Sequence, residues 1–166
     1  MLEGFLRDHV RAPLAHAAAR LSALGASGTS LAAASLVVGL IAVPAIGYGH
    51  FWIGLGLILL SRAIALVAAE TEASTLAAAL DPIFFASLPF AFALADPSRA
   101  LAATFLLFAF VADVAAAPRA WRGIEHAVAA LAFMGACLFP AWFSLIAYGL
   151  GLACFALAGF RIGSGA

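Results

Sequence analysis

The chain has no lysine, few charged residues and two cysteines. Charged residues make up 10% of its 166 residues, and eight arginines are balanced by eight acidic residues, so the formal net charge is zero. A chain without excess positive charge lacks the basic surface that nucleic acid requires, so we expect no nucleic-acid partner. The cysteines lack the CxxC spacing of redox or metal sites, and the chain contains neither a Walker loop nor a dinucleotide-binding glycine motif.

Apolar residues take the place of the missing charge. They make up 66% of the chain, whereas about half of a soluble domain is apolar. The composition therefore predicts an integral membrane protein. Six apolar segments, the fifth of them short, approach the roughly 20 residues that cross the hydrocarbon layer, at 29–47, 50–69, 74–94, 99–117, 125–139 and 141–160. We predict an all-α fold in which residues 25–166 form a single domain, a bundle of six transmembrane helices.

The first 24 residues have a different pattern. Apolar residues recur at about helical spacing, and Glu3 lies four residues before Arg7, as in an amphipathic helix that lies in the membrane interface. The segment lacks the residue order of a cleavable signal peptide. We predict an interfacial helix over residues 1–24, with a solvated N-terminal arm as the alternative.

The arginines predict the orientation of the bundle. With the N-terminus in the cytoplasm, seven of the eight arginines fall on or near the cytoplasmic side, and only Arg99 lies outside. Cytoplasmic loops of membrane proteins carry an excess of basic residues. We therefore expect the inner or plasma membrane of a bacterium, with both termini in the cytoplasm.

Three ionisable residues interrupt the predicted spans, namely Arg62, Asp81 and Asp113. Such a residue costs about 2.5–3.5 kcal/mol at the centre of a membrane helix, so it is usually paired or functional. Counting from the ends of the spans puts all three in the cytoplasmic half. Further charged residues at that rim are Glu70, Glu72, Arg119 and Arg122. We predict one polar binding cluster that faces the cytoplasm; a salt bridge from Arg62 to Asp81 or Asp113 that only joins helices is the alternative.

Three segments carry a resemblance to a known family. They are ILLSRAIALVAAE at 58–70, ALDPIFFASLPFAFALADP at 79–97 and CLFPAWFSLIAYGLGLACF at 137–155. With these segments and its predicted helices, most of the chain resembles the CDP-alcohol phosphotransferase (CDP-alcohol phosphatidyltransferase) family. The resemblance implies a membrane enzyme of phospholipid synthesis, which moves a phosphoalcohol from a CDP-linked donor to an acceptor hydroxyl and releases CMP.

The family's signature, D-x-x-D-G-x-x-A-R-x8-G-x-x-x-D-x-x-x-D, is mostly missing. Its aspartates hold two divalent cations against the pyrophosphate, and the last takes the acceptor's proton. Aligned on Arg62, the first two aspartates are Ala65 and Ala68 here; counted back from Asp81, the third is Ala77. By resemblance, Asp81 is the candidate general base and the only candidate metal ligand. One carboxylate cannot hold two cations that need six or more oxygen ligands between them, so the signature indicates a degenerate site.

Three functional hypotheses remain open. In the first, transferase activity is weak or lost, as in a pseudoenzyme, and a lipid or nucleotide site or a partnership with an active relative is retained. In the second, an active phosphotransferase binds Mg²⁺ or Mn²⁺ with a rearranged carboxylate set, Asp81, Asp113, Glu70, Glu72 and Glu125. In the third, a small scaffold or transporter carries a structural Arg–Asp network. The expected partners are the lipid bilayer, a CDP-linked donor or phospholipid and, by resemblance, a second copy in a homodimer.

Overall fold

The computed structural model describes residues 15–16, 18–23, 25–71, 75–116 and 123–164. All regular structure in these residues is helical. The elements are α2 Gly28–Gly47, α3 Phe51–Thr71, α4 Thr75–Ala95, the 3-10 turn η1 Pro97–Arg99, α5 Ala100–Ala116, α6 Gly123–Leu138, the 3-10 turn η2 Pro140–Trp142 and α7 Phe143–Ser164. Each predicted apolar segment is occupied by one of the α-helices, so the all-α class is confirmed.

Four helical segments of the described chain are long and apolar enough to cross a membrane. They are Gly28–Gly47, Phe51–Ala69, Pro97–Ala116 and Pro140–Phe160. The apolar parts of α4 and α6 are shorter, at Leu80–Ala95 and Ala127–Leu138. By length and apolar composition, therefore, four of the six predicted crossings meet the requirement for a span.

The predicted interfacial helix lies largely outside the described residues. Residues 15–16 and 18–23 are helical, and the amphipathic character of the whole segment stays a prediction. A capping box separates this part from α2: the Ser27 and Ser30 hydroxyls each accept a hydrogen bond, at 3.1 Å, from the other residue's backbone N–H. The exchange satisfies backbone donors that the first turn of a helix would otherwise leave unpaired. It fixes the start of α2 at Gly28.

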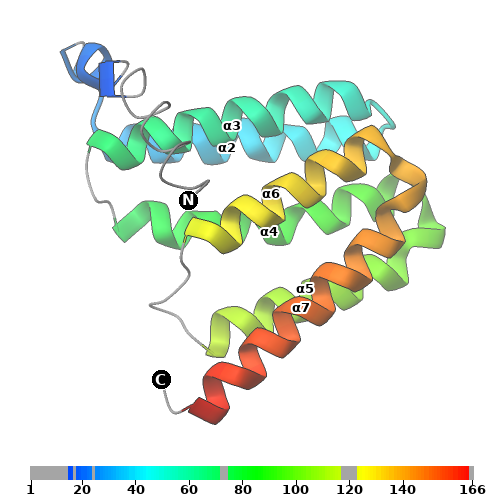
Figure 1. Cartoon of the computed structure of the whole chain (residues 1–166). Helices are drawn as coiled ribbons and strands as arrows, with labels where there is room; N and C mark the ends of the chain where they lie inside the picture. The colour runs from blue at the N-terminus through cyan, green and yellow to red at the C-terminus, as the bar shows by residue number, and fades with distance from the viewer. Residues whose placement is uncertain (1–14, 17, 24, 72–74, 117–122, 165–166) are drawn as a thin grey trace.

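The helices are arranged as pairs (Figure 1). Helices α2 and α3 form an antiparallel hairpin, whose turn includes Gly49 at φ +82°, a backbone conformation that glycine adopts without a steric penalty. Helices α5 and α7 form a second close pair, and α4 and α6 lie between the two pairs. The end of α3 and the start of α4 therefore lie at the same end of the bundle as the start of α2.

Phenylalanine rings join α4, α6 and α7. Phe92 of α4 stacks on Phe143 with ring centroids 4.4 Å apart and an interplanar angle of 10°. It also stacks on Phe133 of α6 at 6.4 Å. All three side chains are fully buried. Aromatic pairs of this kind add about 0.5–1.5 kcal/mol beyond area burial, so the rings fix α4 as the centre of the bundle.

Small residues let the other helices approach closely. A Cβ on Gly39 of α2 would overlap ring carbons of Phe84 of α4, and one on Gly54 of α3 would overlap the side chain of Ile46 of α2. In lipid, the hydrophobic effect does not drive helices together. Close packing of this kind therefore contributes to their association. Gly39 therefore brings α2 against the α4 turn that carries Asp81.

Candidate functional site

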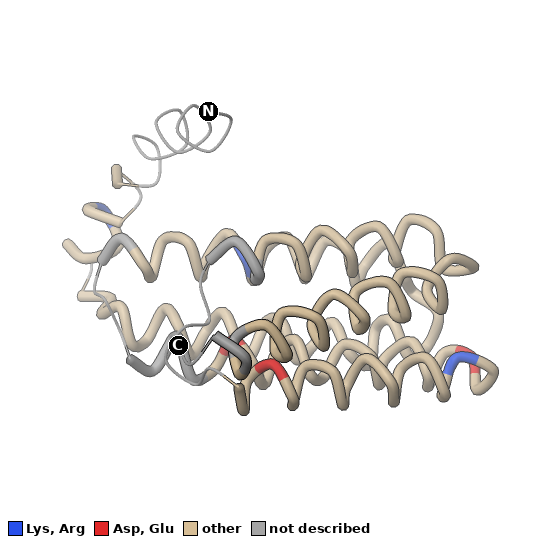
Figure 2. Tube along the Cα trace, turned by 60° about the horizontal axis from the view of Figure 1, so that its bottom comes forward, with Lys and Arg blue, Asp and Glu red and all other residues tan. Residues whose placement is uncertain are grey.

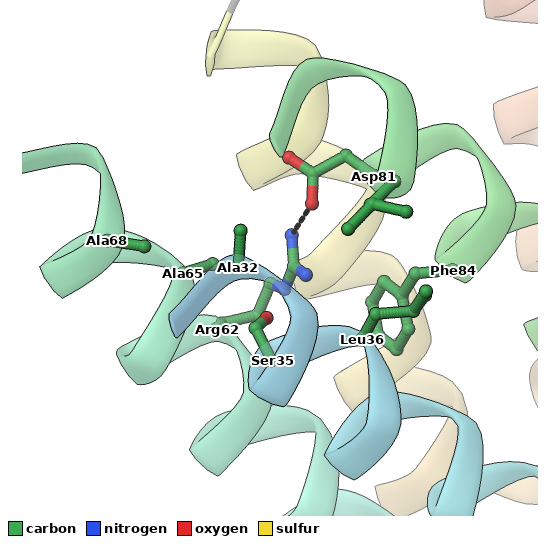
Figure 3. Close-up of a pocket in the computed structure, with 9 residues that line it drawn as sticks. Ala32, Ser35, Leu36, Arg62, Ala65, Ala68, Asp81 and Phe84 are labelled. Carbon is green, nitrogen blue, oxygen red and sulfur yellow. Dashed lines mark hydrogen bonds and ion pairs between the residues drawn. The ribbon is translucent and has the colours of Figure 1, made fainter. Parts of the chain in front are cut away.

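An ion pair between α3 and α4 forms the centre of the site. Arg62 Nη1 donates to Asp81 Oδ1 at 2.9 Å, and the two side chains are 14% and 25% exposed. Arg62 lies more than two turns before the end of α3, and Asp81 lies in the second turn of α4. Helices α3 and α4 both pack chiefly on α2, and the long Arg62 side chain reaches from α3 to Asp81 of α4 (Figure 3). Of the two partners considered for Arg62, the structure pairs it with Asp81.

The Arg62 guanidinium also lies against two aromatic rings. Its Cζ atom is 4.4 Å from the centre of the Phe84 ring and 5.2 Å from that of Phe85. Such cation–π contacts contribute about 0.5–2 kcal/mol, depending on how far the cation is desolvated. The Nε atom is buried and has no hydrogen-bond partner among the described residues. Asp81 and Phe84 thus orient the guanidinium.

Two buried serines, which the sequence analysis did not single out, lie beside Arg62. Ser35 Oγ of α2 donates to the Ser61 carbonyl oxygen at 2.9 Å, and Ser61 Oγ of α3 donates to the Ser35 carbonyl oxygen at 2.8 Å. The two serines are almost equally far from the turn that joins their helices, which is the signal that could have revealed the pair. The reciprocal bonds lock α2 to α3 at the depth of Arg62.

Two cavities flank the ion pair. The smaller, of about 40 Å³, lies between α2, α3 and α4 (Figure 3) and is lined by Ala32, Ser35, Leu36, Arg62, Ala65, Ala68, Leu80, Asp81 and Phe84. The larger, of about 400 Å³, lies between α3, α4 and α6 and is lined by Arg62, Ala65, Leu66, Asp81, Ala127, Ala130, Leu131 and Met134. Arg62, Ala65 and Asp81 line both, so the ion pair separates them.

Of the other predicted site residues, Asp113 is the one whose side chain the structure describes. Asp113 is 2% exposed on α5, a helix that packs chiefly on α7 and α4, and among the described residues no ion pair joins it to Arg62. Glu72, Arg119 and Arg122 lie outside the described residues, and for Glu70 the structure describes the helical backbone alone. The wider cytoplasmic cluster stays a prediction. Charged positions are sparse along the described helices (Figure 2).

The described part of this site does not fit a divalent cation. Mg²⁺ and Mn²⁺ take about six oxygen ligands. Among the described residues Asp81 is the one carboxylate that lines the two cavities, and Ala65 and Ala68 line the smaller cavity with it. The described residues contain no group of three or more His, Cys, Asp or Glu side chains able to hold a metal. What the described site offers a ligand is a guanidinium, a carboxylate and apolar walls.

Comparisons with known proteins give one informative match. No protein-family model matches the chain, and no solved structure matches it. The chain is 32% identical to the inner membrane protein YnjF of Escherichia coli (strain K12), over an alignment of 197 residues that covers 99% of this chain and 95% of YnjF. Because the similarity extends over nearly the whole of both chains, this integral membrane protein belongs to the same family as YnjF.

Proposed function

We propose that this protein is an inner membrane protein with the architecture of the CDP-alcohol phosphotransferases whose site binds a ligand without transferring a phosphoalcohol. The observation that carries the proposal is the lining of the two cavities beside Arg62. Ala65 and Ala68 stand where that family places its first two metal-binding aspartates, and both line the smaller cavity. The family's chemistry depends on cations that neutralise the pyrophosphate during transfer.

The ion pair supports binding over catalysis. A general base must reach the hydroxyl proton that it removes, whereas the Asp81 carboxylate accepts from Arg62 at 2.9 Å. Arg62 in turn is oriented by the Phe84 ring. A pair built in this way joins α3 to α4 and presents a guanidinium to both cavities. The pair retains a guanidinium that can bind a head group, while the described residues supply no set of metal ligands.

The same proposal includes the membrane topology. All six helices α2 to α7 cross the bilayer, with both chain ends and the Arg62–Asp81 pair on the cytoplasmic side, as the distribution of arginine favours. Helix α6 has 16 residues, or about 24 Å at 1.5 Å per residue, and a short span is accommodated by local thinning of the bilayer. Labelling of single cysteines at Tyr48 and Ser98, both expected outside, by a membrane-impermeant maleimide tests this arrangement. Protection of both from the outside would contradict it.

The experiment that tests the functional proposal compares the wild type with a variant in which two carboxylates are restored. We expect purified wild-type protein to release no CMP from CDP-diacylglycerol with Mn²⁺ and an acceptor alcohol, and to show no change in Tm with Mn²⁺. Ala65→Asp combined with Ala68→Asp adds oxygen ligands beside Asp81, so Mn²⁺ should raise the Tm of that variant, in keeping with metal binding to the folded state. Robust CMP release by the wild type that Asp81→Asn abolishes would overturn the proposal.

A further inference from the structure

We propose that the first turns of α4, residues 75–81, form a hinged segment that pivots at Pro82 and is held closed by the Arg62–Asp81 pair, so that its opening joins the two cavities beside Arg62. This inference rests on the proposed function, since it names what controls access to the same site. The carrying observation is a proline inside α4 directly after the residue that forms the ion pair.

The hinge follows from the position of Pro82. It lies inside the helix Thr75–Ala95, and it has no N–H to donate to the carbonyl oxygen four residues earlier. Its ring also crowds that carbonyl group, which is why sharp bends of helices occur mostly at proline. The turns before Pro82 are therefore joined to the rest of α4 by fewer backbone hydrogen bonds than an uninterrupted helix has. A segment can pivot at such a position while its neighbours stay folded.

Packing changes at the same point of α4. After Pro82 the helix is anchored in the core, where Phe84 and Phe85 are fully buried. Directly before Pro82, Leu80 and Asp81 are only partly buried. Helices α3 and α4 make few direct contacts with each other, so the ion pair is an important part of what holds this turn against α3. Segments with little buried apolar contact are the ones that open most readily.

The ion pair is suited to opening and closing because it is only partly withdrawn from water. Arg62 and Asp81 are 14% and 25% exposed, so both charges can regain water when they separate, whereas charges of a fully buried pair cannot. The Arg62 guanidinium lies 4.4 Å from the centre of the Phe84 ring. Because Phe84 belongs to the anchored part of α4 beyond Pro82, it keeps Arg62 in place while Asp81 moves away.

Opening changes the space that the site offers. The smaller cavity, of about 40 Å³, is lined by Ala68 and Leu80, and the larger, of about 400 Å³, by Ala127, while Arg62 and Asp81 line both. Movement of the hinged segment displaces Asp81, which separates the cavities, and Leu80, which lines the smaller one. The closed pair therefore confines a ligand to the larger cavity, and the open pair adds the space between α2 and α3.

The test measures how fast an introduced thiol reacts with a small uncharged methanethiosulfonate, in mild detergent and with both Cys137 and Cys154 replaced by alanine. Ala68→Cys is the reporter, since Ala68 is 1% exposed and lines the smaller cavity and not the larger. Ala127→Cys is the reference, from an exposed position that lines the larger cavity. We expect Asp81→Asn to raise the rate at Ala68→Cys about tenfold, equivalent to about 1.4 kcal/mol in the opening equilibrium, and to leave Ala127→Cys unchanged. An unchanged rate at Ala68→Cys, or an equal rise at both positions, would overturn the proposal.

Pro82→Ala tests the hinge itself. It restores a backbone N–H, so it should lower the rate at Ala68→Cys about threefold with Asp81 intact and remove most of the rise that Asp81→Asn causes. The first of these effects does not require Asp81→Asn to fold. Pro44→Ala is the matched control, since Pro44 also lies inside a helix, at an exposed position near the far end of α2. A rate that Pro82→Ala leaves unchanged, or that Pro44→Ala lowers equally, rejects the hinge.

Two further comparisons keep the outcomes distinct. With Cys137→Ala alone, the remaining thiol is Cys154, which is 8% exposed on α7 and reports loosening of the whole bundle. Asp81→Asn should leave its rate unchanged, and a rise equal to that at Ala68→Cys would contradict a motion confined to residues 75–81. The labelling is also independent of the CMP assay. CMP release by the wild type overturns the proposed function and not the hinge, whereas unchanged labelling rejects the hinge and leaves the proposed loss of transfer standing.

Discussion

Two Arg–Asp pairs among the described residues differ in almost every physical respect. Arg62 and Asp81 are 19 residues apart, on two helices, with the bond at 2.9 Å between part-buried groups. Arg99 and Asp96 are three residues apart at the turn between α4 and α5, at 3.4 Å, and Asp96 is 41% exposed. Each arginine lies near a phenylalanine ring, Phe84 at 4.4 Å and Phe51 at 6.0 Å.

The two ion pairs differ in whether their partners come from one turn or from two helices. Asp96 caps η1 and accepts from the Ser98 N–H at 3.0 Å and the Ser98 hydroxyl at 2.7 Å, so its partners come from its own turn. Asp81 meets Arg62 only when α3 and α4 are both packed on α2. The Arg99–Asp96 pair stabilises its own turn. The Arg62–Asp81 pair forms only in the folded bundle, and its two side chains line both cavities.

The largest loss of stability should come from replacing one partner of the Arg62–Asp81 pair. Arg62→Leu leaves the Asp81 carboxylate without its cation at a part-buried position, and we expect a loss of about 2–3 kcal/mol, below the 3–5 kcal/mol of fully buried pairs. Thermal unfolding in mild detergent measures the loss. Arg62→Leu combined with Asp81→Leu should recover most of it, because no charge then remains unpaired. Losses that simply add in the double variant would show that the two side chains are not coupled.

The α3–α4 region can also be disturbed through the ring beneath Arg62. Gly39→Ala places a methyl group against ring carbons of Phe84, which is fully buried, so the ring or α2 must shift. Overpacking of this kind costs about 1–3 kcal/mol. Gly56→Ala is the matched control on α3, since a Cβ there meets nothing within 4 Å. Equal stability of the two variants would show that the close approach of α2 to Phe84 does not contribute to the fold.

The comparison also explains what the sequence could predict. Apolar length and turn residues located every helix of the described bundle, because hydrocarbon thickness limits segment length directly. The Arg62–Asp81 pair could be foreseen because consecutive antiparallel helices place Arg62 and Asp81 at similar depths, although the sequence does not show that both helices pack chiefly on α2. The depth of Asp113 could be counted in the same way, yet α5 packs chiefly on α7 and α4 rather than on α3.

The sequence does not show which neighbour Asp113 faces, because all helix faces are apolar. In a soluble helix a polar stripe marks the face that points away from the core, whereas lipid-facing and core-facing residues here are equally apolar. Leu131 and Phe133 are both large and apolar on α6, but the first is 68% exposed and the second 1%. Depth along the membrane normal can therefore be predicted from this sequence, and rotation of a helix about its axis cannot. The spacing of Ser35 and Ser61 from their turn indicates a common depth, and their hydrogen bonds depend in addition on both helix rotations.

The smallest effect should come from the local pair, and it should depend on pH. Hydrogen bonds from the Ser98 hydroxyl and backbone N–H, with a further contribution from Arg99, hold the pKa of Asp96 below its ordinary value of 3.8. Because the folded pKa is the lower one, the stabilisation is fully present above the unfolded pKa and is lost as pH falls through the folded pKa. Asp96→Asn keeps a capping side chain and removes the charge. We therefore expect a slightly higher Tm for the wild type at pH about 6 and equal Tm values once the pH falls below the folded pKa. A difference that persists unchanged at low pH would mean that packing of the turn, and not the charge of Asp96, separates the two proteins.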